Sequence, residues 1–186
     1  AYQHRTGPDS RTNLSKALAA LEASVTAWSP ERAPREWAIT ALNLGNRYSR
    51  MRDHAQAIPF YEQARGILEG LIQSFPENTA YRRNAIRAAS GLGLSQFRTG
   101  DSTAALETLN RALAAQEQLP ANLQETTDFL EERAILFSNL GNVYLQGLQD
   151  DEAALQSYQR GIEIRKQLVQ ENAESASAWR GLSVAQ

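Results

Sequence analysis

The chain has 186 residues, of which 42% are hydrophobic, and a formal net charge of −2 at pH 7. This length and apolar content suit one compact domain or a short stack of repeats and argue against wholesale disorder. The near-neutral charge argues against a nucleic-acid or anionic-membrane partner held by bulk charge. The chain has no cysteine, which excludes disulfides, zinc ribbons and thiol nucleophiles.

The predicted elements are all helices, because apolar residues recur every three or four positions and Ala, Leu, Glu, Gln and Arg dominate. A polar tail over residues 1–9 precedes the first of them. Asp53 and Asp101 are N-cap candidates, and Pro76 and Pro120 end helices at two turns. In chain order, we expect helices near residues 10–28, 35–51, 53–74, 79–98, 101–117, 122–147, 150–172 and 175–185.

A Leu-Gly pair recurs along the chain, with its glycines, Gly45, Gly93 and Gly141, spaced by 48 residues both times. Each pair lies in a run of residues that are apolar at every third or fourth position, as on one side of a helix. A short polar segment and a second run of the same kind follow, which predicts a pair of helices. The third polar segment is one residue longer, so its second helix is offset by one. A glycine at the crossing point lets two helix backbones approach, and an alanine on the second helix does the same from the other side. A tyrosine fills the wedge where the helices diverge. The best-matched repeat contains Leu44, Gly45, Tyr48, Ala57, Tyr61 and Ala64.

This pattern resembles the tetratricopeptide repeat (TPR) family over roughly residues 35–172. The resemblance implies an all-α fold, a right-handed α-solenoid of antiparallel helix pairs. The usual repeat has about 34 residues. The longer period here adds about two turns, roughly 10 Å, to each helix. Long repeats of this kind look like bacterial TPR arrays, which often accompany a caspase-like protease or another effector domain.

The resemblance also sets the expected domain organisation, which is a single solenoid over residues 10–186. Because an unfinished repeat leaves an apolar face uncovered, we expect the chain to be a fragment or to have its ends capped by something else. The expected units are a partial repeat over 10–34, repeats over 35–78, 79–121 and 122–172, and a partial repeat over 173–186.

No group of residues has the pattern of a catalytic or cofactor site. The histidines, His4 and His54, have no second metal ligand at helical spacing. Gly91-Leu-Gly93 follows a helical pattern and not a strand, so it is not a nucleotide loop. We therefore predict a protein that is not an enzyme and that needs no cofactor or metal. We expect a cytoplasmic location, although the chain begins at Ala1 without an initiator Met, so an upstream segment could be missing.

The first helices of the repeats carry the candidate binding residues, since in this family the first helices line the concave groove. Asparagines there can hold the backbone amides of an extended peptide, and arginines can hold an acidic side chain. An equal alternative is a structural role within or between repeats, such as capping or bridging. Ile39 and Ile135 stand where a chaperone-type carboxylate clamp needs basic residues, so we reject that specific reading. The candidates are Asn43, Asn46, Arg50, Arg87, Leu94, Phe97, Arg98, Asn139, Asn142 and Gln146.

The predicted function is recognition of a protein or peptide segment of unknown identity in this groove. The alternative is a regulatory or assembly module of a larger effector that self-associates through its exposed terminal helices. The three tryptophans, Trp28, Trp37 and Trp179, lie near predicted helix ends, where they either pack between helices or form contact points for a partner.

Overall fold

The computed structural model describes the backbone of residues 30–184 and the side chains of residues 30–170. The predicted tail over 1–9 and helix over 10–28 lie outside these residues. The described part contains helices and no strand, which confirms the predicted all-α solenoid of consecutive antiparallel helix pairs. Its elements are α2 (Pro34–Arg50), α3 (His54–Ser74), α4 (Thr79–Arg98), α5 (Ser102–Glu117), α6 (Ala121–Gln124), α7 (Thr127–Asn142), the π-helix η1 (Val143–Leu148) and α8 (Asp151–Val184).

The chain divides within α4 into two compact units, the first ending at Ser95. In the first unit, small and large apolar residues from α2, α3 and α4 interlock in one cluster. Trp37 of α2 belongs to this cluster and is only 6% exposed, so its role is packing between helices. The other buried members are Ala41, Leu42, Ala57, Tyr61, Ala64, Ala88 and Leu92.

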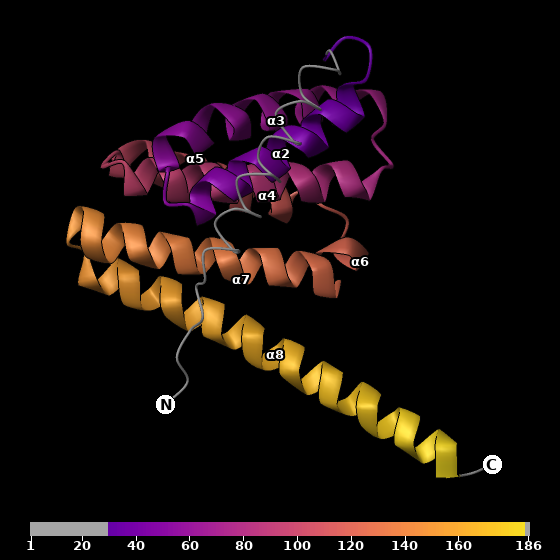
Figure 1. Ribbon diagram of the computed structural model, residues 1–186. Helices are drawn as coiled ribbons and strands as arrows, with labels where there is room; N and C mark the ends of the chain where they lie inside the picture. The colour runs from indigo at the N-terminus through magenta and orange to yellow at the C-terminus, as the bar shows by residue number, and fades with distance from the viewer. Residues whose placement is uncertain (1–29, 185–186) are drawn as a thin grey trace, which may run out of the picture. The chain divides into compact units, whose positions relative to one another are not determined.

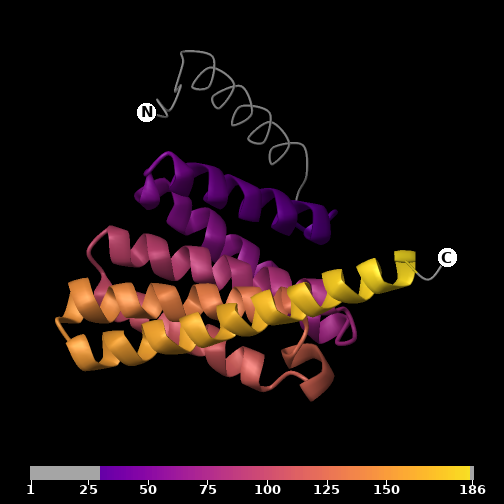
Figure 2. The same ribbon diagram turned by 90° about the horizontal axis from the view of Figure 1, so that it is seen from below.

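The second unit begins at Gln96 and contains α5, α6, α7, η1 and α8. Figures 1 and 2 show α7 and α8 side by side, with α8 continuing past the end of its partner. Leu109 of α5 and Leu136 of α7 are fully buried. Leu140 and Ala154 are nearly so, which places the core of this unit along the α7–α8 seam and beneath α5.

The turns between paired helices share one local structure in all three repeats. An aspartate caps each second helix: Asp53, Asp101 and Asp150 accept hydrogen bonds from the backbone N–H three residues later, at 3.3, 2.9 and 3.0 Å. The N-cap predictions for Asp53 and Asp101 are thus confirmed. The residue before each aspartate has a positive φ, 63° at Arg52, 97° at Gly100 and 56° at Gln149. Only glycine adopts this conformation without a steric cost.

We expect Gln149→Gly to stabilise the chain, because it removes the side chain of a residue held in the left-handed region. The gain should be about 0.5–1 kcal/mol in the free energy of unfolding. Urea denaturation measures it. Gln159→Gly, at an exposed position inside α8, is the control and should cost about 1 kcal/mol. A loss of similar size in both variants would contradict the prediction.

The predicted single helix over 122–147 is wrong, because the structure interrupts it between α6, which ends at Gln124, and α7, which begins at Thr127. Where α6 ends, side chains donate hydrogen bonds to backbone carbonyls that a continuing helix would use for its own backbone hydrogen bonds. Thr126 Oγ1 donates to the Leu123 carbonyl at 2.8 Å, and Gln124 Nε2 donates to the Leu119 carbonyl at 2.7 Å. Thr126 is then extended and starts α7.

The π-helix η1 lies at the predicted one-residue insertion of the third repeat. One residue more lies between Gly141 and Asp150 than between Gly45 and Asp53. A π-helical turn accommodates an extra residue without ending the helix. The helix therefore continues to Leu148, and the turn keeps the same cap as the other two repeats.

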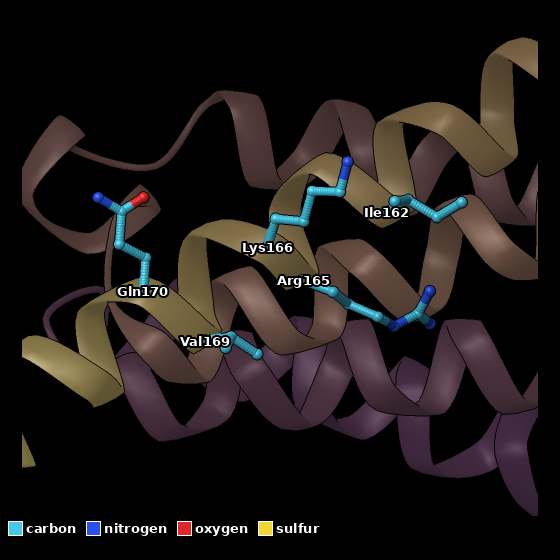
Figure 3. Close-up of a pocket in the computed structure, with 5 residues that line it drawn as sticks. All are labelled: Ile162, Arg165, Lys166, Val169 and Gln170. Carbon is cyan, nitrogen blue, oxygen red and sulfur yellow. The ribbon is translucent and has the colours of Figure 1, made fainter.

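The predicted break between helices over 150–172 and 175–185 is also wrong, because α8 is continuous from Asp151 to Val184. The stretch between Gly161 and Gly181 has no proline or glycine to stop a helix. By contrast, α3 ends just before Pro76. One side of α8 also presents exposed Ile162 and Val169 beside a shallow hollow (Figure 3).

Candidate peptide-binding surface

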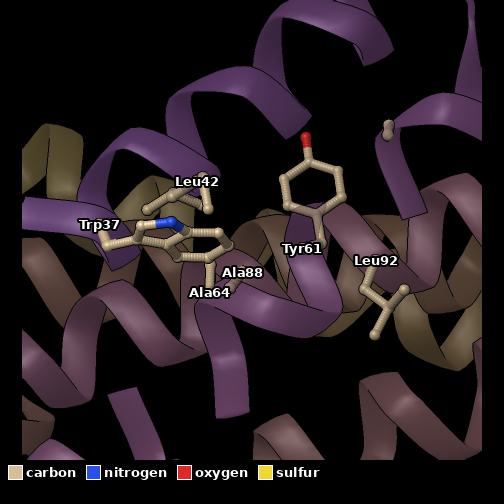
Figure 4. Close-up of a cluster of buried hydrophobic side chains, with 8 residues drawn as sticks. Trp37, Leu42, Tyr61, Ala64, Ala88 and Leu92 are labelled. Atoms are coloured by element: carbon tan, nitrogen blue, oxygen red, sulfur yellow. The ribbon is translucent and has the colours of Figure 1, made fainter. Parts of the chain in front are cut away.

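Tyr61 of α3 is wedged between the first helices of two repeats, α2 and α4 (Figure 4). A Cβ atom added to Gly45 of α2 would lie 2.7 Å from Tyr61 Cε1. One added to Gly91 of α4 would lie 2.4 Å from Tyr61 Cζ. Both distances are far below van der Waals contact, so the absence of side chains at these glycines makes room for the ring. The predicted wedge role of a tyrosine is confirmed, and the structure identifies this tyrosine as Tyr61 of the second helix.

The Tyr61 hydroxyl lies where several predicted binding residues meet. It donates to Asn46 Oδ1 at 2.9 Å. Burial raises the pKa of Tyr61 to about 12, and this outweighs the Ser49 hydrogen bond and the positive charges of Arg50 and Arg87, which lower it. The positive charges of Arg50 on α2 and Arg87 on α4 therefore act on the same hydroxyl group, and both side chains are exposed to solvent. The structure thus brings one amide and two guanidinium groups together at Tyr61.

The third repeat, in the second unit, has the same tyrosine–asparagine pair. Tyr158 of α8 donates its hydroxyl hydrogen to Asn142 Oδ1 at 2.8 Å. A Cβ atom added to Gly141 would lie 2.4 Å from Tyr158 Cε1. Asn46 and Asn142 thus each have a structural role, as the alternative reading of the sequence allowed. Their carbonyl oxygens accept from tyrosine, which leaves the amide N–H groups to donate elsewhere.

The remaining candidates differ in how far they reach solvent. Asn43 of α2 and Gln146 of η1 are exposed, whereas Asn139, the counterpart of Asn43, is buried. Leu94 is half-buried. Phe97 is also half-buried and lies under the Arg98 guanidinium, whose central carbon is 5.3 Å from the ring centroid. Two groups of predicted residues therefore come together: Asn46, Arg50 and Arg87 around Tyr61, and Phe97 with Arg98.

A mixed polar hollow in the second unit was missed by sequence reasoning. Arg133 of α7 donates from Nε to Gln116 Oε1 at 3.2 Å, and the Arg160 guanidinium carbon is 5.7 Å from the Phe137 ring centroid. These four residues come from three helices and do not occupy equivalent positions in the repeats. The sequence pattern therefore could not group them, and only the packing of α5 against α7 and α8 brings them together. The hollow is lined by Leu113, Glu117, Gln124, Arg133, Phe137, Arg160, Glu163 and Ile164.

The described residues offer no group of three or more His, Asp or Glu side chains arranged to hold a metal ion. Within the same part of the chain, every helix is too short or too polar to span a bilayer. The surface around Tyr61 presents an amide hydrogen-bond donor and the positive charges of two arginines.

Two family models described as tetratricopeptide repeat match the chain, over residues 37–69 and 136–168. The chain is a tetratricopeptide repeat protein. The two matched TPR segments contain the two wedge tyrosines, Tyr61 and Tyr158, with their glycines, Gly45 and Gly141. A comparison with the curated proteins finds no match.

TPR helix pairs generally mediate contacts between proteins and are typically non-catalytic. In this TPR chain the first helices are α2, α4 and α7 and the second helices are α3, α5 and α8. The candidate binding residues fall on the first helices and, for Gln146, on η1, which continues α7.

Proposed function

We propose that the chain binds an extended, acidic segment of another protein at the exposed faces of α2 and α4 around Tyr61, in its first unit. The gathering of Asn46, Arg50 and Arg87 at the Tyr61 hydroxyl carries this proposal. The asparagine amide would donate to a backbone carbonyl of the ligand. The two arginines would pair with acidic side chains, which charge-assisted hydrogen bonds favour over neutral ones.

The polar group is held in place before any ligand arrives. Tyr61 is 2% exposed and fixes the Asn46 side chain through its hydroxyl, so the amide N–H groups have a defined direction. A preorganised donor loses less side-chain entropy on binding than a free one. In the second unit Asn142 is fixed in the same way by Tyr158. Phe97 and Leu94 would add apolar contacts on α4.

Replacing the arginines tests the acidic preference. A random peptide library selected on the immobilised chain should yield sequences enriched in Asp and Glu. Arg50→Ala or Arg87→Ala should then weaken the selected peptide about tenfold or more in titration calorimetry, because each removes a charge-assisted hydrogen bond. Arg111→Ala, an exposed arginine on the second helix α5, is the matched control and should change nothing. Selection of uncharged peptides, or an equal effect of Arg111→Ala, would contradict the proposal.

The role of the asparagines needs a variant that keeps the fold. Asn46→Asp retains an oxygen that accepts from Tyr61 but removes both amide N–H donors. We expect unchanged thermal stability with weaker peptide binding. Tyr61→Phe is the converse control, since it keeps the donors and removes the hydroxyl. Full peptide affinity in Asn46→Asp would show that Asn46 acts only as a structural partner of Tyr61.

A further inference from the structure

The mixed polar hollow of the second unit has the size and the lining of a small-ligand site. We call it the mixed hollow. Its volume is about 380 Å³, within the range of sites that hold small molecules. The helices that line it, α5, α6, α7 and α8, all belong to the second unit, so the site is separate from the surface around Tyr61.

Arg133 of α7 is held in the mixed hollow by two uncharged side chains. Its Nε donates to Gln116 Oε1 at 3.2 Å, and its Nη2 donates to Gln124 Oε1 at 3.5 Å. Gln116 is fully buried and itself donates to the Phe129 carbonyl at 3.1 Å, which fixes its position. Two of the five N–H donors of Arg133 are thus used. The other three, on Nη1 and Nη2, include the fork that binds a carboxylate through two parallel hydrogen bonds.

The positive charge of Arg133 has no carboxylate partner among the described residues. The side chain is half-buried, so water screens its charge less than it would at an open surface. Arg160 of α8 adds a second positive charge to the same hollow, with its guanidinium carbon 5.7 Å from the centroid of the Phe137 ring. It too forms no ion pair within the described part of the chain. Both arginines can therefore accept an anion without first breaking an ion pair.

Two glutamates supply the opposite charge. Glu117 of α5 and Glu163 of α8 line the hollow and are exposed, and neither forms an ion pair with a described cation. The charges of the two arginines and the two glutamates cancel, which disfavours a strongly negative ligand such as a phosphate. A ligand that carries one carboxylate and one ammonium group would satisfy both signs at once.

The rest of the lining is mainly apolar. Leu113, Phe137 and Ile164 are half-buried and come from α5, α7 and α8. They offer a surface on which an aliphatic or aromatic side chain can bury apolar area. Because Arg133 is half-buried and the glutamates are exposed, a ligand would place its carboxylate deeper in the hollow than its ammonium group.

We propose that the mixed hollow binds a free apolar amino acid, such as leucine, as its zwitterion. The α-carboxylate accepts two hydrogen bonds from the unused fork of Arg133, and the α-ammonium group pairs with Glu117 and Glu163. The amino-acid side chain packs on Leu113, Phe137 and Ile164. This proposal does not depend on peptide binding at Tyr61, so Arg50→Ala should leave it unaffected.

Titration calorimetry of the full chain with L-leucine tests the site, and we expect saturable binding of a single molecule. Three analogues each lack one recognised group: leucinamide lacks the carboxylate, N-acetyl-leucine lacks the ammonium group, and glycine lacks the side chain. Each should bind at least about tenfold more weakly than leucine. Equal binding of N-acetyl-leucine would show that the hollow recognises a carboxylate alone and would overturn the proposal. So would a chain that binds no leucine at about 10 mM.

Arg133→Gln should weaken leucine binding at least about tenfold, because it removes the charged fork. The variant also leaves Gln116 without its donor, so far-UV circular dichroism must show that the helical fold is kept. Arg111→Gln, at an exposed position of α5 outside the hollow, is the matched control and should bind leucine normally. Full leucine affinity in folded Arg133→Gln would contradict the proposal.

A second variant does not disturb any hydrogen bond of the hollow. Glu117→Gln combined with Glu163→Gln changes only exposed side chains. It should weaken leucine at least about tenfold but leave the weak binding of N-acetyl-leucine unchanged, because that analogue has no ammonium group to lose. Glu107→Gln combined with Glu131→Gln makes the same change of charge at exposed positions outside the hollow and should have no effect. An equal effect of the two double variants would overturn the assignment of the ammonium site.

Discussion

Gly91→Ala should destabilise the first unit by about 2–3 kcal/mol, the cost of overpacking a rigid core. The new methyl carbon would lie 2.4 Å from Tyr61 Cζ and 2.8 Å from its hydroxyl oxygen. Tyr61 is 2% exposed and is bonded to Asn46, so the ring cannot move aside without losing its own contacts. Chemical denaturation followed by circular dichroism measures the loss.

Gly66→Ala gives the matched control with the opposite sign. Gly66 lies inside the helix α3, and an added Cβ atom would meet nothing within 4 Å. The substitution should therefore stabilise the chain by about 0.5–1 kcal/mol through helix propensity alone. Combining Gly91→Ala with Tyr61→Leu should recover part of the loss. A neutral or stabilising Gly91→Ala would mean that α3 and α4 are not packed as closely as the structure has them.

Raising the pH from 10 to 12 should cost the fold about 2–3 kcal/mol through Tyr61 alone. Burial raises the pKa of Tyr61 from about 10 to about 12 in the folded chain. Between these values the unfolded chain releases the proton and the folded chain keeps it. The stabilisation is therefore complete below pH 10 and is lost as the pH rises through 12, at about 1.4 kcal/mol per pH unit.

Tyr61→Phe isolates this effect, since phenylalanine keeps the ring and has no proton to lose. The variant should be about 1 kcal/mol less stable than the unsubstituted chain at pH 8, because Asn46 loses a hydrogen-bond partner. Its stability should fall less steeply above pH 10. The rest of the chain is identical in the two proteins, so its contribution cancels in the comparison. Parallel pH profiles for both proteins would contradict the raised pKa of Tyr61.

The sequence predicts which repeat positions carry the candidate site residues, but it does not predict which side chains those residues contact. The repeat pattern places Asn46 and Asn142 at equivalent positions, and each accepts a hydrogen bond from the tyrosine of its own repeat, Tyr61 or Tyr158. It could not show that tyrosines from the second helices occupy their carbonyl oxygens, because that depends on how closely each helix pair packs. The repeat pattern contains Gly93 and not Gly91, although Gly91 is the glycine that meets Tyr61. The two glycines are two residues apart and lie on different sides of α4, so only the packing of α3 against α4 shows which side meets Tyr61.

The amino-acid sequence by itself determined the helical class, the repeat interval, the aspartate caps and the wedge tyrosine, because each depends on local spacing within one helix or turn. The tertiary structure alone decided the π-helical insertion of η1, the grouping of Arg50 and Arg87 around Tyr61, and the exposure of Leu155, Ile162 and Val169 on α8. These features depend on which helix lies against which, and residues far apart in sequence set that packing together. Apolar residues at every third or fourth position indicate which side of a helix is apolar. The neighbouring helices then decide whether that side is covered.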